Sequence, residues 1–272
     1  MSEHFRLETP VGTLAVRTVG DPGLPVALLW HSLFVDDSSW TRVERDLAAD
    51  RRLVLVTGPG HGASSDPGHR YTLEDCAAAA AAVIDALEIQ EPVDWVGNAW
   101  GGHVGIVFAA TWPQRCRSLI AIGAPVHAYT LKNRLRVRAL LDVYRLAGPV
   151  TFIRDAVAGA LLSAQTHQRD REAQRLVRSA FAGADRHGMA NAVESISLRR
   201  PDLTPMLSLV SVPTLFITGS EHPDWSPAQA EAASRLLPHG SAATVDEAAY
   251  LAPLEEPAEV TRLVRNFWRD TA

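Results

Sequence analysis

Three segments of this chain hold residues whose types and spacing suit chemistry on a small molecule. The sequence Gly-Asn-Ala-Trp-Gly at residues 97–101 lies between an apolar run and a helical pattern, which places Ala99 at a strand-to-helix turn. Its methyl group can neither attack a substrate nor release a proton. The hydroxyl of Tyr250 and the imidazole of His222 can exchange protons, and Asp224 stands two residues beyond His222. These groups favour acid–base chemistry over a covalent intermediate.

Alternating strand and helix patterns must position these residues. Two extended segments open the chain, and apolar runs typical of strands in a parallel sheet follow. The expected strands are residues 5–7, 13–19, 26–30, 53–56, 93–96, 118–122, 213–218 and 242–245. The expected helices run from Ser38 or Ser39 to Leu47, over 72–87 and 100–110, from Pro227 onward, and over 257–269. The alternation predicts an α/β fold with a doubly wound, mostly parallel, eight-stranded sheet.

Residues 127–205 interrupt this alternation with helical patterns alone. They hold 13 Arg and Lys against 7 Asp and Glu, a net charge of +6 in a chain of net charge −5, so the remainder carries −11. We expect a helical cap over a core made of residues 1–126 and 206–272. The basic surface suits either a lid or an ordinary solvated helix surface. The pair Arg199-Arg200 likewise suits either contact with an anionic group or a solvated helix end.

Five sequence motifs, in the same order, resemble those of the α/β-hydrolase superfamily. Residues 97–101 resemble the nucleophile elbow, in which glycines let strand and helix approach closely. The other four are His31-Ser-Leu-Phe34, the Gly-rich loop at 58–67, the strand and turn at 213–225, and Ala248-Ala-Tyr-Leu-Ala-Pro253. By this resemblance they supply an oxyanion loop, a family loop, the catalytic acid and the catalytic base.

The resemblance also shows where this chain departs from the family. The positions of the nucleophile, the base and the acid hold Ala99, Tyr250 and His222. The elbow context, with a Trp after the nucleophile position, is closest to haloalkane dehalogenases and epoxide hydrolases. Those enzymes also need a nucleophile, so the resemblance implies that ordinary covalent hydrolysis is lost. An engineered alanine in place of a natural nucleophile is the alternative.

Other features of the pocket follow from loop shape. The backbone N–H groups of Leu33 and Trp100 are expected to remain as oxyanion-type donors. His31, Leu33, Phe34 and Trp100 are the candidate substrate-binding residues. We expect Tyr250 and His222 to form one hydrogen-bonded unit facing the space above Ala99, because family base and acid touch each other.

Composition narrows the function classes. The net charge of −5 argues against nucleic-acid binding, and no run approaches the ~18 apolar residues of a membrane span. The two cysteines and the absence of metal-ligand spacing predict a cytoplasmic protein without cofactor or metal. The leading interpretation is a repurposed enzyme for a small, mostly apolar organic ligand, acting by isomerisation, elimination or cyclisation. A non-catalytic ligand-binding protein and a hydrolase with a mutated nucleophile are the alternatives, and the oligomeric state is left open.

Overall fold

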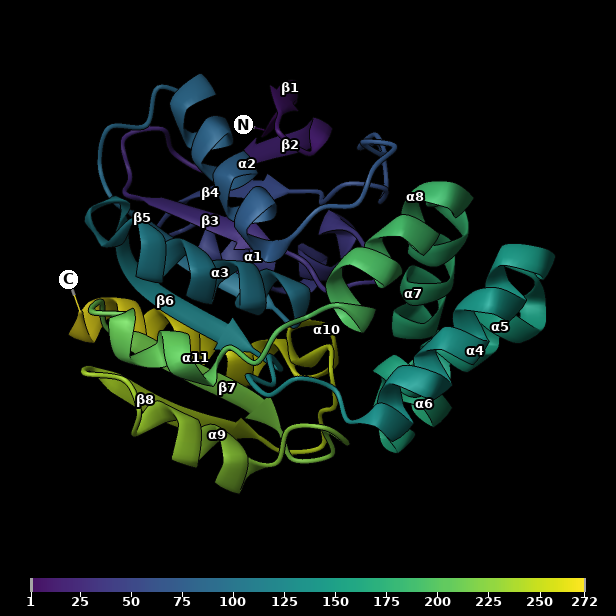
Figure 1. Ribbon diagram of the computed structural model, residues 1–272. Helices are drawn as coiled ribbons and strands as arrows, with labels where there is room; N and C mark the ends of the chain where they lie inside the picture. Colours follow the sequence, from purple (N-terminus) through teal and green to yellow (C-terminus); the bar gives the residue numbers. More distant parts are fainter. Residues whose placement is uncertain (1, 272) are drawn as a thin grey trace.

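The computed structural model describes residues 2–271 and contains one eight-stranded sheet (Figure 1). Its order is β1-β2-β4-β3-β5-β6-β7-β8. The strands are β1 Ser2–Thr9, β2 Gly12–Val19, β3 Val26–Trp30, β4 Arg52–Val56, β5 Val93–Asn98, β6 Cys116–Ile122, β7 Thr214–Gly219 and β8 Gly240–Val245. β1, β2 and β4 pair antiparallel, and every other pairing is parallel. The predicted mostly parallel, eight-stranded α/β sheet is confirmed.

Helices cover both faces of the sheet and bury two separate apolar clusters. One face is covered by α2 Leu73–Ala86, α3 Trp100–Thr111 and α9 Pro227–Ser234. The other is covered by α1 Thr41–Leu47, α10 Ala252–Glu255 and α11 Pro257–Asp270. Alternation along β3 divides its side chains between the clusters, with Leu28 on the first face and Leu29 on the second. Both faces of the central strands are therefore buried, as their continuous apolar runs predict.

One predicted helix start differs from the structure. A 3₁₀ turn, Asp37–Trp40, precedes α1, and its cap is Asp36 rather than Ser38 or Ser39. The Asp36 carboxylate accepts from the backbone N–H of Ser38 at 3.0 Å. A carboxylate one turn earlier thus replaces the serine hydroxyls as the capping group.

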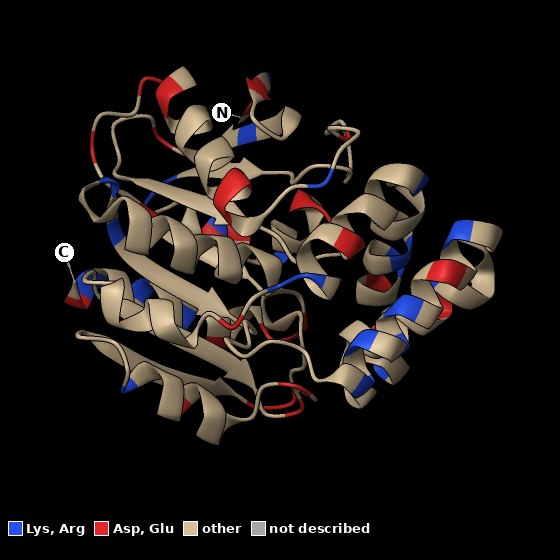
Figure 2. Ribbon diagram, in the orientation of Figure 1, with Lys and Arg blue, Asp and Glu red and all other residues tan. Residues whose placement is uncertain are grey.

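Between β6 and β7 the chain forms helices and turns, which lie beside the carboxyl ends of the parallel strands (Figure 1). We call residues 131–198 the helical insertion. It comprises α4 Leu131–Ala147, α5 Thr151–Leu161, α6 Ala164–Arg169, α7 Arg171–Gly183, α8 Arg186–Ala192 and a π-helix, Val193–Leu198. Figure 2 shows basic residues spread along these helices. Within residues 2–271 no helix is both long and apolar enough to cross a membrane.

Candidate active site

Ala99 lies at the tip of a sharp turn between β5 and α3. Its φ of 47° and ψ of −101° are unfavourable for a residue with a side chain. The turn requires glycine on both sides: a Cβ at Gly97 would lie 2.1 Å from the Gly101 backbone, and one at Gly101 would lie 1.9 Å from the carbonyl oxygen of Trp30. The elbow geometry predicted for residues 97–101 is therefore present, with Ala99 at the nucleophile position.

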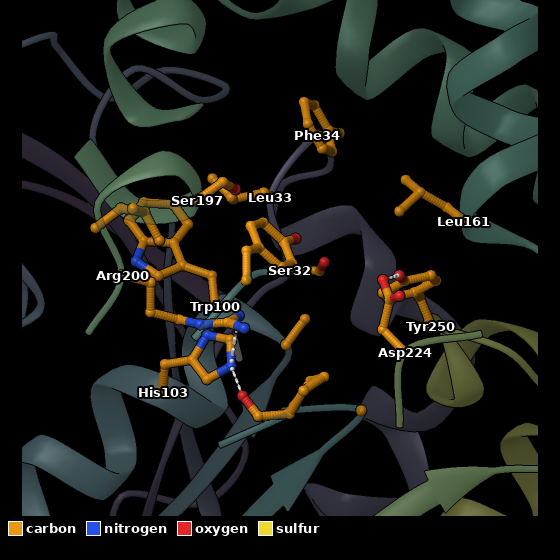
Figure 3. Close-up of a pocket in the computed structure, with 15 residues that line it drawn as sticks. Ser32, Leu33, Phe34, Trp100, His103, Leu161, Ser197, Arg200, Asp224 and Tyr250 are labelled. Atoms are coloured by element: carbon orange, nitrogen blue, oxygen red, sulfur yellow. Dashed lines mark hydrogen bonds between the residues drawn. The ribbon is translucent and has the colours of Figure 1, made fainter. Parts of the chain in front are cut away.

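Ala99 lines a cavity that is also lined by residues of the helical insertion. Figure 3 shows the side chains around this cavity. The space among its lining residues is about 490 Å³ when open solvent is included, the room inside for water-sized molecules is about 60 Å³, and most of the wall is apolar. Leu161, Ile196 and Ser197 of the helical insertion line it, and so does Arg200, which follows the insertion closely. The other lining residues are Ser32, Leu33, Phe34, Ala99, Trp100, His103, Gly123, Pro125, Tyr129, Asp224 and Tyr250. The prediction that Ala99 faces a cavity under residues 126–205 is confirmed.

The loop after β3 presents Leu33 and Phe34 to the cavity, as predicted. Phe34 has a φ of 71°, and its backbone N–H donates to His61 Nε2 at 3.3 Å. The N–H groups of Leu33 and Trp100 make no hydrogen bond with another group in residues 2–271. Since both residues line the cavity, these two donors are available to an oxygen atom bound there.

His31, predicted from the sequence to bind substrate, is not among the residues that line this cavity. Its Nδ1 lies 2.7 Å from the Ser32 carbonyl oxygen, and its Nε2 accepts from the Gly58 N–H at 2.8 Å. Complete burial lowers its pKa to about 4, which keeps the ring neutral. Both nitrogens are used to join two loops, which makes His31 a support for the site.

Tyr250 and Asp224 form a pair on one wall of the cavity (Figure 3). The Tyr250 hydroxyl donates to Asp224 Oδ2 at 2.5 Å. His222 packs its ring against the Tyr250 ring, with centroids 3.9 Å apart, and its Nδ1 accepts from the Asp224 N–H at 3.2 Å. The predicted hydrogen bond between Tyr250 and His222 is therefore wrong. The turn after β7 places the Asp224 carboxylate next to the Tyr250 hydroxyl and packs the His222 imidazole against the Tyr250 ring.

The protonation states of Tyr250 and His222 follow from the burial of their side chains. Burial, and then the hydrogen bond to Asp224, raise the pKa of Tyr250 well above its usual range, so the hydroxyl stays protonated. Burial lowers the pKa of His222 to about 4. Because its Nδ1 accepts a hydrogen bond, the neutral ring carries its proton on Nε2. This nitrogen makes no hydrogen bond within residues 2–271.

Two polar residues that the sequence did not single out hold the Tyr250 loop. Asn98, beside the elbow, donates from Nδ2 to the carbonyl oxygens of Ile122 at 3.1 Å and Tyr250 at 2.8 Å. Glu255 is buried and accepts from the N–H groups of Ala249 at 2.9 Å and Leu251 at 3.1 Å. Its other oxygen accepts from the N–H of Ser163 in the helical insertion at 2.6 Å. Asn98 adjoins the elbow motif, which is a usable signal, whereas no pattern marks Glu255.

Another wall of the cavity carries positive charge. Arg200 is only 6% exposed and lies beside His103, away from Tyr250 and Asp224 (Figure 3). Arg199 is exposed. Of the two alternatives for this pair, the solvated helix end therefore describes Arg199, while Arg200 lines the cavity.

Known proteins resemble the chain across its length. A putative 2-succinyl-6-hydroxy-2,4-cyclohexadiene-1-carboxylate synthase from Bacillus subtilis (strain 168) is 25% identical over 93% of both chains. 3-Oxoadipate enol-lactonase 1 from Acinetobacter baylyi is 23% identical over 94% of this chain and 92% of its own. A thermophilic esterase from Thermogutta terrifontis superimposes with a TM-score of 0.89 at 25% identity, covering 99% of both chains.

The enol-lactonase of Burkholderia xenovorans LB400 has the same fold, with a TM-score of 0.85 at 23% identity, covering 94% of this chain and 96% of its own. The sequence profile described as alpha/beta hydrolase fold matches residues 28–248. That match includes the elbow, the loop after β3 and the turn that carries Asp224. The chain belongs to the α/β-hydrolase fold family.

Proposed function

We propose that this protein is an enzyme that moves a proton on a small carbonyl compound without forming a covalent intermediate. The observation that carries the proposal is the Tyr250–Asp224 pair on the wall of a cavity whose nucleophile position holds Ala99. An alanine gives the elbow no attacking group. A carboxylate held by a protonated tyrosine still offers a base, and the backbone N–H groups offer a place for an oxyanion.

The proposed step is an enolisation. The substrate carbonyl oxygen accepts from the N–H groups of Leu33 and Trp100. The Asp224 carboxylate removes a proton from the adjacent carbon, the electrons of that C–H bond form a C=C bond, and the π electrons of the C=O bond move onto the carbonyl oxygen. Tyr250 keeps the carboxylate oriented, and return of the proton to another carbon completes an isomerisation. From the same enolate, elimination would expel a leaving group from the carbon next to the former C–H carbon, and ring closure would require attack on a second, electrophilic carbon of the substrate.

The helical insertion acts as a cap in this proposal. Leu161, Ile196 and Ser197 close the cavity from that side and exclude water from the developing charge. The mostly apolar wall suits a small organic substrate. Relatives named as a 3-oxoadipate enol-lactonase and a cyclohexadiene-carboxylate synthase support a small, oxygen-bearing molecule as the substrate.

Proton exchange tests the proposal directly. The purified protein is incubated in D₂O with cyclohexanone, methyl 4-oxopentanoate and 4-oxopentanoate, and loss of the proton signal beside the carbonyl is followed by NMR. We expect exchange above the buffer rate with at least one compound. Asp224→Asn should lower the rate by roughly 10²–10⁴-fold, the usual contribution of a general base.

Asp142→Asn is the matched control, since Asp142 lies on the outer surface of α4 and is exposed. It should exchange at the wild-type rate. Binding of these compounds without any exchange would favour a non-catalytic binding protein instead. Turnover of esters or enol-lactones by the unmodified protein would favour a hydrolase and contradict the proposal.

A further inference from the structure

Arg200 is a buried cation with few partners. Its Nη2 donates to the His127 carbonyl oxygen at 2.7 Å, and its Nη1 lies 3.1 Å from His103 Nε2. The guanidinium carbon stacks 4.8 Å from the centre of the Tyr129 ring. Its Nε–H has no hydrogen-bond acceptor in residues 2–271. Of five N–H donors on this side chain, the protein therefore satisfies at most two.

Neither neutral form of His103 satisfies all the polar groups at this contact. Burial, and then the positive charge of Arg200, hold the pKa of His103 well below its usual range, so the ring is neutral. Its Nε2 also lies 3.0 Å from the Pro125 carbonyl oxygen. With the proton on Nε2, the ring donates to Pro125 and offers Arg200 nothing. With the proton on Nδ1, that N–H has no acceptor within residues 2–271.

The charge of Arg200 is also uncompensated at close range. It makes no ion pair within the described chain, and Asp224 and Asp202 act on it only through longer-range attraction. A buried charge without a hydrogen-bonded counterion is unfavourable, so such groups are normally paired or exposed. Here the unpaired cation lines the cavity, where a bound anion would supply the missing acceptors.

We propose that Arg200 is the binding site for a carboxylate on the substrate, whose carbonyl end lies toward Ala99 and Asp224. A planar guanidinium with free neighbouring donors matches the two oxygens of a carboxylate. This inference rests on the proposed function, since it takes the same cavity as the substrate site. It narrows the substrate to small oxo acids, with an anionic end at one wall and an acidic C–H bond at the other.

Paired acids and esters test the assignment by isothermal titration calorimetry. The probes are 3-oxobutanoate, 4-oxopentanoate and 5-oxohexanoate, each compared with its methyl ester, which keeps the shape but loses the charge. We expect at least one acid to bind wild type tenfold or more tightly than its ester. The best chain length then reports the distance from Arg200 to the elbow. Equal affinity for acid and ester in all three pairs would overturn the assignment.

Variants identify the residue responsible. Arg200→Gln should abolish the preference for the acid while leaving ester affinity within about twofold. Arg199→Gln is the matched control, because its side chain is exposed, and should keep the full preference. If Arg200→Gln does not fold, Arg200→Lys retains the charge without the planar fork and should lose most of the preference. An unchanged preference in a folded Arg200 variant would refute the proposal.

Two further measurements separate this inference from the proposed function and from another anion. Inorganic phosphate is titrated against wild type and Arg200→Gln, and Arg200-dependent binding as tight as that of the best acid would assign the site to phosphate and overturn the carboxylate. Acid binding through Arg200 without proton exchange would sustain this inference and reject the proposed enolisation. Proton exchange on the methyl esters, without tighter binding of any acid, would support the proposed enolisation and reject Arg200 as a carboxylate site.

Discussion

Ala99 holds the strained backbone of a nucleophile elbow while carrying a methyl group. The groups around it do not include an imidazole placed to activate a nucleophile at the elbow. Tyr250 stays protonated because burial raises its pKa, and its hydroxyl already donates to Asp224. His222 lies behind the tyrosine and its Nδ1 is occupied by the Asp224 N–H. A hydroxyl introduced at the elbow would therefore lack the imidazole that removes its proton in a serine hydrolase.

Ala99→Ser alone should give no appreciable esterase activity. The oxyanion donors and binding would leave a residual acceleration of roughly 10³-fold over water. Turnover of p-nitrophenyl acetate should stay far below the ~1 per second at which ordinary enzymes begin. The double variant Ala99→Ser/Tyr250→His restores a base beside Asp224 and should be faster than the single variant. Esterase turnover at ordinary rates by Ala99→Ser would show that a base has been overlooked.

Tyr250→Phe tests the orientation of the carboxylate, since it removes the hydroxyl and little volume. A hydrogen bond to a charged group contributes about 1.5–3 kcal/mol, so proton exchange should slow by roughly 10–100-fold. Ligand affinity should change little, because the ring and its packing on His222 remain. Tyr144→Phe, which removes a hydroxyl in the helical insertion away from the cavity lining, is the control. Exchange at the wild-type rate in Tyr250→Phe would make this hydroxyl dispensable.

At the scale of elements, one amide joins three parts of the site. Asn98 ends β5, and its side chain donates to the end of β6 and to the Tyr250 loop. It is buried, so an apolar replacement would leave the Tyr250 carbonyl oxygen without its donor, and the Ile122 carbonyl oxygen would keep only the Ala99 N–H. Each such loss costs about 1–3 kcal/mol.

Asn98→Leu should therefore lower the free energy of unfolding by about 2–4 kcal/mol, measured by urea denaturation. Gln114→Ala, an exposed amide beyond α3, should stay within about 0.5 kcal/mol of wild type. If the two variants are equally stable, Asn98 does not hold the loop.

The sheet and elbow were predictable because their signals are local. Buried strands need continuous apolar runs, and the close approach of β5 and α3 needs the glycines at 97 and 101. The partner of Tyr250 was not predictable in this way. His222 and Asp224 share one turn, and which of them reaches Tyr250 depends on how that turn closes, for example by the hydrogen bond from Thr218 Oγ1 to the Trp225 carbonyl oxygen at 2.6 Å.

The same limit applies to the helical insertion. Its helices were predictable, but which of its side chains reach the cavity was not. Ile196 and Ser197 face the cavity from a π-helix, whose wider turn changes the direction of side chains relative to an α-helix. The burial of Arg200 also depends on how the insertion rejoins the core, since adjacent Arg199 is exposed.

At the scale of the whole molecule, an ion pair fastens the helical insertion to the core. Arg42 of α1 donates to both oxygens of Asp170, at 2.5 and 2.9 Å, and also to the Leu254 carbonyl oxygen at 2.8 Å. Asp170 caps α7 by accepting from the Ala173 N–H at 2.8 Å. The hydrogen bond from Arg42 is the largest of the interactions that lower the pKa of Asp170 to about 2.

This depressed pKa makes the attachment pH-dependent. An aspartate in the unfolded chain titrates near pH 3.9, above its folded value of about 2. As pH falls below about 4, the unfolded state therefore takes up a proton that the folded state does not. The stabilisation by Asp170 is fully present above that pH and is lost as the pH falls toward 2.

Asp170→Asn isolates this charge, because asparagine caps a helix about as well as aspartate. At pH 7 the variant should be less stable than wild type in urea denaturation, and the difference should shrink steadily between pH 4 and pH 2. Asp155→Asn is the matched control, since Asp155 pairs with Arg178 inside the insertion and does not reach the core. At pH 7 the stability of Asp155→Asn should differ less from that of wild type, because both members of the Asp155–Arg178 ion pair are more exposed than Arg42 and Asp170. A gap between wild type and Asp170→Asn that stays constant down to pH 2 would mean that the contact acts through shape, with its charge contributing nothing to holding the insertion over the cavity.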